Sequence, residues 1–173
     1  PGLPVRGGAH PGLPSAGLKG SGGLMGRSAR LVAEPASVPW GANMRMKIEW
    51  IDHLVLTVRD VEATCAFYAQ VLGMSVMTFG AGRKALSFGE QKINLHQYGR
   101  EFEPKANQST PGSADLCFVT AVPVKQVLEH LRANKVEVLE GPVARTGAMG
   151  PITSVYFRDP DGNLIEVSNY SDA

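Results

Sequence analysis

Three residues with side chains that bind divalent metals lie on short segments in which apolar residues alternate. His53 lies in I-D-H-L-V-L-T-V, His96 ends K-I-N-L-H, and Glu166 lies in N-L-I-E-V-S. Two imidazoles and a carboxylate form a mixed nitrogen and oxygen set that suits Zn, Ni, Co, Mn or Fe(II) without distinguishing between them. A carboxylate among apolar neighbours is costly to bury unless it is paired or bound to metal. We therefore predict that these three residues bind one divalent metal ion.

Asp115 is a fourth candidate ligand, because it occupies the place in the second half of the chain that His53 occupies in the first. Its shorter side chain would also suit a place beside the ligands, where it would orient an imidazole or a bound water. Each candidate has a structural alternative. A single histidine on a strand is more often a hydrogen-bonded structural residue, and either acid would be unremarkable on an outward-facing strand.

Two further residues are candidates for substrate binding. Cys117 shares a strand face with Asp115, and the alternative is a small residue of the core. Arg145 lies in G-P-V-A-R-T-G-A-M-G-P (141–151), which is rich enough in Gly and Pro to predict a loop. There it would meet an anionic substrate or remain solvated. The charged segment R-E-F-E-P-K (100–105) joins the two halves as a lid or a linker.

The order of predicted elements is the same in both halves. The first half has a strand at 51–58, a helix at 61–72 with Asp60 as N-cap and Gly73 at its end, and strands at 74–79, 85–88 and 92–98. The second half has a strand at 114–120, a helix between Pro123 and Asn134, and strands at 136–139, 154–158 and 163–168. The sequence thus predicts two β-α-β-β-β modules. Offsets of 62 and 70 residues make His53 equivalent to Asp115, and His96 to Glu166.

The first 48 of the 173 residues differ from the rest in composition. They hold ten Gly and six Pro, six basic residues and one acid, so they carry about five positive charges, whereas residues 49–173 carry about four negative charges. Residues 1–48 bury too little apolar surface to offset ordering, so we predict a disordered basic tail. It resembles a mitochondrial transit peptide, or it is foreign to the mature protein.

Composition also excludes some partners. A mildly acidic body without a basic stripe argues against nucleic acid, and no apolar run is long enough for a membrane span. Cys65 and Cys117 do not make a disulfide framework, and without a secretory signal both are expected to be reduced thiols. We expect a cytoplasmic protein, or a mitochondrial one if the tail is a transit peptide.

Four motifs resemble the vicinal oxygen chelate superfamily, the glyoxalase and bleomycin-resistance fold: I-D-H-L-V-L-T-V, F-Y-A-Q-V-L-G-M, K-I-N-L-H and F-R-D-P-D-G-N-L-I-E-V. The resemblance covers about 49–171 of the predicted domain, 49–173. It implies an α+β fold whose modules, about 49–99 and 113–170, form an open mixed-sheet half-barrel around a metal cleft. The ligand positions of the glyoxalase I branch then fall on His53, His96, Asp115 and Glu166.

The resemblance also implies a function. A glyoxalase-like lyase or isomerase would chelate an enediolate on its divalent metal, and Glu166 would be the catalytic proton carrier. The expected partners are a small-molecule substrate, for which a glutathione adduct is one candidate, and a second copy of the chain. The alternatives are a bleomycin-resistance-type protein that binds a small molecule without reacting it, and a dioxygenase of the same superfamily.

Overall fold

The computed structural model describes residues 45–170. The predicted basic tail, 1–48, therefore lies almost entirely outside the described residues. Residues 45–52 are exposed and form neither helix nor strand. No helix between residues 45 and 170 is long and apolar enough to cross a membrane.

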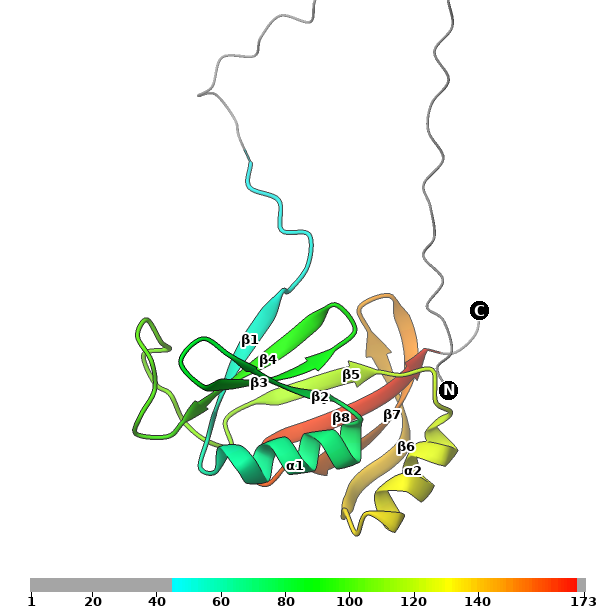
Figure 1. Cartoon of the computed structure of the whole chain (residues 1–173). Helices are drawn as coiled ribbons and strands as arrows, with labels where there is room; N and C mark the ends of the chain where they lie inside the picture. Colours follow the sequence, from blue (N-terminus) through cyan, green and yellow to red (C-terminus); the bar gives the residue numbers. More distant parts are fainter. Residues whose placement is uncertain (1–44, 171–173) are drawn as a thin grey trace, which may run out of the picture. The chain divides into compact units, whose positions relative to one another are not determined.

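Each half of the described chain contains one strand, one helix and three further strands (Figure 1). Module 1 consists of β1 (His53–Val58), α1 (Val61–Leu72), β2 (Ser75–Phe79), β3 (Arg83–Phe88) and β4 (Gln91–Gln97). Module 2 consists of β5 (Asp115–Val119), α2 (Val124–Ala133), β6 (Val138–Gly147), β7 (Gly150–Arg158) and β8 (Leu164–Tyr170). The strand orders, β1-β4-β3-β2 and β5-β8-β7-β6, are equivalent. The predicted α+β fold of two β-α-β-β-β modules is confirmed.

Both helices begin and end where their capping residues predict. The Asp60 carboxylate accepts a hydrogen bond from the Ala63 amide at 3.0 Å, which satisfies one of the free N–H groups of the first turn of α1. Gly73 ends α1 with a φ of 68°, a conformation that costs little only without a Cβ. Pro123 and Asn134 flank α2.

The segment predicted as a loop at 141–151 is instead the greater part of a hairpin between β6 and β7. Arg145 pairs with Ile152, and register shifts between Val138 and Val143 take up the irregular residues of β6. Gly141 lies in this irregular region with a φ of 121°, and a Cβ there would approach the Ser154 carbonyl oxygen to 2.6 Å. Bulges tolerate Gly and Pro within a strand, so composition alone wrongly predicted a loop.

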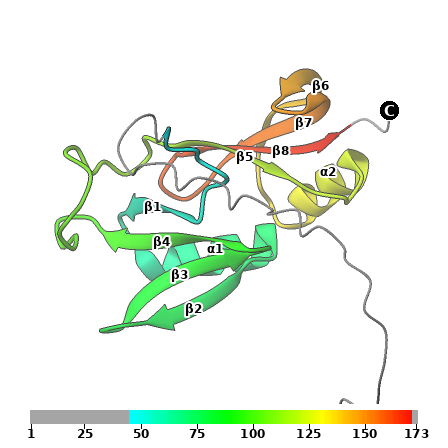
Figure 2. The same cartoon turned by 90° about the horizontal axis from the view of Figure 1, so that it is seen from above.

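One apolar core joins the two modules. In Figure 2 the sheet of module 1 lies beside that of module 2, with α1 against the first and α2 against the second. Leu56 and Val58 of β1 and Ile165 and Val167 of β8 are buried in this core. Because side chains alternate along a strand, the residues between them face away from the core. We call this second surface of each sheet its open face.

The turn between β7 and β8 fastens module 2 to module 1. Asp159 accepts a hydrogen bond from the Tyr68 hydroxyl of α1 at 3.0 Å. Asp161, whose side chain is 3% exposed, accepts hydrogen bonds from the backbone amide and the guanidinium of Arg59. The D-P-D-G motif therefore joins the two modules, and its two carboxylates are engaged by these hydrogen bonds.

Candidate functional site

Strand register shows which predicted ligands share a layer of the module 1 sheet. β1 and β4 are parallel, with His53 beside Lys92, Val55 beside Asn94, and Thr57 beside His96. His53 and His96 are therefore both on the open face but four residues apart along the strands, about 13 Å. One ion could bind both imidazoles only if the two side chains extended fully towards each other along the strands. The register therefore argues against His96 as a partner of His53 at one metal ion.

Module 2 repeats this geometry. Its register shows that the predicted equivalence of His96 and Glu166 is wrong. Asp115 lies beside Leu164, and Glu166 lies beside Cys117, two residues further along. Glu166 thus corresponds to Asn94, not to His96. The corrected offset is 72 residues. The pair His53 and Asn94 in one sheet matches the pair Asp115 and Glu166 in the other.

Sequence reasoning missed Asn94, although K-I-N-L-H places it in mid-strand between two buried apolar residues. Its side-chain Oδ1 is buried and has no hydrogen-bond partner among residues 45–170. Leaving such an acceptor unsatisfied costs about 1–3 kcal/mol. Asn94 therefore offers an oxygen atom that could bind a metal ion. It lies on the open face, two residues along the strands from the layer of His53.

His53 is oriented by its neighbour in the chain. Its Nδ1 lies 2.6 Å from Oδ1 of Asp52, and the hydrogen bond from His53 lowers the pKa of the Asp52 carboxyl. A carboxylate on one ring nitrogen fixes the tautomer, and Nε2 makes no hydrogen bond to any residue that the structure describes. Because the side chain is 45% exposed, Nε2 is accessible to an ion at the surface of the sheet.

Glu166 lies within a network of hydroxyl and thiol groups. The Ser168 hydroxyl donates to its Oε1 at 3.2 Å, and Ser168 also contacts the Ser154 hydroxyl at 2.9 Å and the Cys117 thiol at 3.4 Å. Burial raises the pKa of Glu166, but hydrogen bonds from Ser154, Tyr156, Ser168 and Cys117 together outweigh it and lower the pKa below its usual value. Glu166 is therefore an ionised, oriented carboxylate at neutral pH.

A cavity of about 520 Å³ opens over this carboxylate. Glu166, Cys117 and Arg145 all line it, together with Tyr156, so three of the predicted site residues meet here. Asp115 does not line the cavity and is exposed at the start of β5. Arg145 donates to Glu140 at 2.8 Å and to the Tyr156 hydroxyl at 3.2 Å, so its charge already has a partner.

His96 has different surroundings. It is 7% exposed, and its ring lies 5.6 Å from that of Phe102, edge to face. Burial lowers the pKa of His96, which makes the neutral imidazole the dominant form at neutral pH. The structure thus separates the predicted ligands into three places: His53 with Asn94, Asp115 near Glu166, and His96 with Phe102. Among residues 45–170 no three His, Cys, Asp or Glu residues are close enough to hold one ion.

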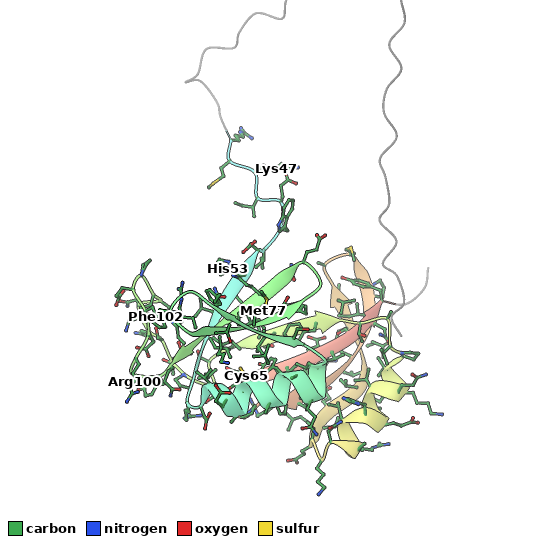
Figure 3. The ribbon with its side chains drawn as sticks, viewed as in Figure 1. Lys47, His53, Cys65, Met77, Arg100 and Phe102 are labelled. Atoms are coloured by element: carbon green, nitrogen blue, oxygen red, sulfur yellow. The ribbon has the colours of Figure 1, made fainter. Side chains whose placement is uncertain are left out.

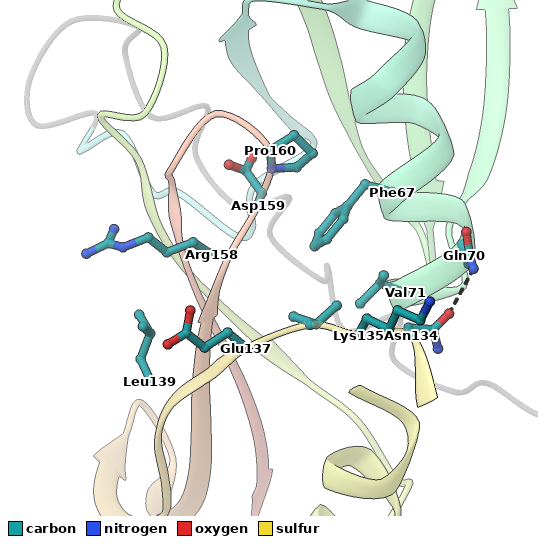
Figure 4. Close-up of a pocket in the computed structure, with 11 residues that line it drawn as sticks. Phe67, Gln70, Val71, Asn134, Lys135, Glu137, Leu139, Arg158, Asp159 and Pro160 are labelled. Carbon is teal, nitrogen blue, oxygen red and sulfur yellow. Dashed lines mark hydrogen bonds between the residues drawn. The ribbon is translucent and has the colours of Figure 1, made fainter. Parts of the chain in front are cut away.

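A second cavity, of about 430 Å³, lies on the helix side of the molecule (Figure 4). Phe67 and Gln70 of α1, Lys135 after α2 and Pro160 of the β7–β8 turn are among the residues that line it. Gln70 donates to Asn134 at 2.9 Å across it. None of the predicted site residues lines this cavity.

Comparison with known proteins agrees with this architecture. The model of the glyoxalase/bleomycin resistance protein/dioxygenase superfamily matches residues 50–167. A virulence protein of Salmonella typhimurium, STM3117, is 58% identical over 128 residues, which cover 74% of this chain and 89% of that protein. The glyoxalase domain-containing protein RDO1 of Mycosarcoma maydis is 55% identical over 137 residues, 78% of this chain and 77% of RDO1. A solved integron cassette protein of V. cholerae is 61% identical, with a TM-score of 0.72 over 73% of this chain and 99% of that one.

Proposed function

Because the chain belongs to the glyoxalase/bleomycin resistance protein/dioxygenase superfamily, we propose that it is a metal-dependent enzyme of the lyase or isomerase type. Its substrate would be a small molecule with two adjacent oxygen atoms. The observation that carries the proposal is the matched placement of donors on the two open faces, His53 with Asn94 and Asp115 with Glu166.

These four side chains fit a divalent ion. They supply one imidazole nitrogen, one amide oxygen and two carboxylates, a set that suits Mn, Fe(II), Co, Ni or Zn. The ion would act as a Lewis acid on the substrate oxygens. The fit rests on two features of the described residues: Asp52 occupies the Nδ1 of His53 and leaves its Nε2 available, and the Oδ1 of Asn94 is buried without a partner.

Glu166 is the residue best placed to move a proton. Its lowered pKa keeps it ionised at neutral pH, so it can accept a proton from a substrate carbon in the cavity. The hydroxyls of Ser168 and Tyr156 orient the carboxylate, and transfer of the proton to the adjacent carbon would complete an isomerisation. A hemithioacetal of glutathione is one substrate that this chemistry accommodates.

We propose that the donors meet between two copies of the chain. Each sheet offers two donors, and no three such residues cluster within residues 45–170. Apolar residues on the same open faces are exposed, including Val55 at 46% and Val119 at 59%. In a twofold homodimer, module 1 of one copy would face module 2 of its partner, which would complete two equivalent sites and cover these residues.

Elemental analysis of the purified protein, alone and beside two single variants, tests this arrangement. The expected result is one transition metal per chain, lost in His53→Ala and in Glu166→Ala. Mixing and reannealing the two variants adds a sharper test. In a heterodimer of the two variants, one site carries both substitutions and the other site carries neither. The metal content of heterodimers should therefore recover to about half of the wild-type occupancy.

A site within one chain would recover no metal on mixing, because each chain would still lack one ligand. No metal in the reconstituted wild type would overturn the proposal and favour a protein that binds a small molecule without reacting it. With metal present, turnover of methylglyoxal and glutathione is measured with Zn, Ni, Co and Mn in turn. Absence of turnover with all four would exclude the glutathione-dependent reaction and leave the metal site in place.

A further inference from the structure

Two cations on the open face of module 1 have no carboxylate partner within residues 45–170. Arg83 of β3 lies in the same layer of the sheet as His96, and Lys92 of β4 lies two layers away beside His53. Ion pairs within 4.0 Å join other residues of the described chain but neither of these two cations. We infer that Arg83, His96 and Lys92 form a subsite for an anionic group of the substrate, a carboxylate or a phosphate-type oxyanion. This inference rests on the proposed function.

Aromatic rings hold the Arg83 side chain in place. Its guanidinium carbon lies 4.7 Å from the centre of the Phe79 ring and 5.5 Å from that of Phe102. Stacking on aromatic rings occupies the faces of the guanidinium, whereas an oxyanion binds its N–H edge in a bidentate manner. Arg83 is thus oriented before any ligand binds, with donors still available at its edge. Lys92 also contacts the Phe79 ring, with its Nζ 4.7 Å from the ring centre.

The linker between the modules closes one side of this cluster. Figure 3 shows Phe102 in the linker at the end of the module 1 sheet, and its ring also contacts His96. The linker is held by Glu101, which accepts hydrogen bonds from the Gly99 amide at 2.8 Å and from Lys105 at 3.0 Å. The charge of Glu101 is therefore already matched by Lys105. Glu101 therefore makes its ion pair with Lys105 and none with Arg83.

The layers of the sheet fix how far this subsite lies from the proposed metal ligands. The layer of Arg83 and His96 is two residues from that of Asn94, about 7 Å, and four from that of His53, about 13 Å. The backbone of Lys92 lies in the His53 layer, but its ammonium reaches the Phe79 ring that Arg83 also contacts. An anion bound at the Arg83 guanidinium would therefore lie at least one layer from Asn94. The inferred substrate class is an organic acid or a phosphate ester.

Titration of the full chain without added metal tests the subsite. Inorganic phosphate and glutarate serve as probes at constant ionic strength, and binding is followed by NMR at the Arg83 side-chain Nε–H and the backbone amides of 92–97. We expect saturable shifts and an affinity weakened about tenfold or more in Arg83→Gln. Lys84→Gln removes the same charge from the adjacent residue, which faces the opposite side of the sheet, and should leave the affinity within about twofold of wild type.

Several results would overturn the subsite. Shifts that do not saturate, or that weaken equally in Arg83→Gln and Lys84→Gln, would mean non-specific attraction. The wild type could instead bind neither phosphate nor glutarate, while Arg83→Gln self-associates more weakly. That pair of results would mean that Arg83 pairs with an acidic residue of the second copy and not with a ligand. If Arg83→Gln fails to fold, Arg83→Lys replaces it; it keeps the charge but lacks the planar fork, so an unchanged affinity would exclude bidentate binding.

The metal analysis is independent of this titration. Arg83→Gln should retain the wild-type metal content, and loss of metal would assign Arg83 to the assembly of the metal site instead. Saturable anion binding by a chain that takes up no metal would refute the proposed function and leave the subsite standing.

Discussion

The Tyr68 hydroxyl donates a hydrogen bond to Asp159 across the boundary between the two modules, and both residues are buried. Asp159 also accepts from the Asn163 side chain at 2.7 Å and from the backbone amides of Asp161 and Asn163. One carboxylate therefore shapes the β7–β8 turn and fastens it to α1. Burial and the charge of Asp159 raise the pKa of Tyr68, so its hydroxyl remains a donor throughout the physiological range.

We predict that Tyr68→Phe lowers the free energy of unfolding by about 1.5–3 kcal/mol, because it removes a hydrogen bond to a charged acceptor. Urea denaturation followed by circular dichroism measures the change. Tyr98→Phe, at a residue that is 58% exposed, should change stability by less than about 0.5 kcal/mol. If Tyr68→Phe changed the free energy of unfolding as little as Tyr98→Phe, the hydrogen bond between Tyr68 and Asp159 would contribute no stability.

Asn94 provides a test of the corrected register. Asn94→Leu should lower the affinity for the metal about tenfold or more, whereas Asn94→Asp keeps an oxygen donor and should stay within a few-fold of wild type. Isothermal titration with Mn(II) or Zn(II) measures both affinities. Ser87→Ala, on the same face beside Lys92, is the matched control. If His96→Ala abolishes binding and Asn94→Leu does not, the expected equivalence of His96 and Glu166 is restored.

The ionisation of Glu101 should make the stability of the linker depend on pH. Hydrogen bonds from the Gly99 amide and from Lys105 lower the pKa of this carboxyl to about 2. A carboxyl whose pKa is lower in the folded state stabilises that state above its unfolded pKa, and this contribution is lost as the pH falls. Protection of the Gly99 amide from hydrogen exchange should therefore decline between about pH 4.5 and pH 2.

Lys105→Met should raise the Glu101 midpoint, because it removes a donor and a positive charge. Carboxyl ¹³C titration of selectively labelled protein measures the midpoint directly. An unchanged midpoint in Lys105→Met would mean that the linker is held without this ion pair.

The hydrogen bond from Ser168 helps to keep Glu166 ionised. Ser168→Ala removes a hydrogen bond to the carboxylate and should raise the pKa of Glu166. It also removes the partner of the buried Ser154 hydroxyl, so we expect a loss of about 1–3 kcal/mol in the free energy of unfolding. Carboxyl ¹³C titration and urea denaturation measure the two effects, with Ser87→Ala as the control. A stable variant with an unchanged Glu166 titration would contradict the described network.

Local chemistry predicted the elements better than the site. The capping residues Asp60 and Gly73 determine the ends of α1 through contacts within one turn, so the sequence was sufficient. Alternation correctly predicted which residues share a strand face, including Cys117 with Asp115. It could not predict register, which depends on turn lengths and on pairing between strands distant in sequence. For that reason the offsets along the sequence align His96 with Glu166 and give no sign of Asn94. Composition places Arg145 in a loop, because it does not show that a bulge accommodates Gly141 in a strand.

The positions of Asn94 and Glu166 in the middle of paired strands have a consequence for divergence. Insertions in the β3–β4 turn or the β7–β8 turn change residue numbers without moving either side chain, because strand pairing, not chain length, determines its height on the sheet. The two halves can therefore accumulate different loops while their donor positions remain matched. Searches for related chains that require fixed spacing between ligands would miss members that a comparison of strand ladders would find.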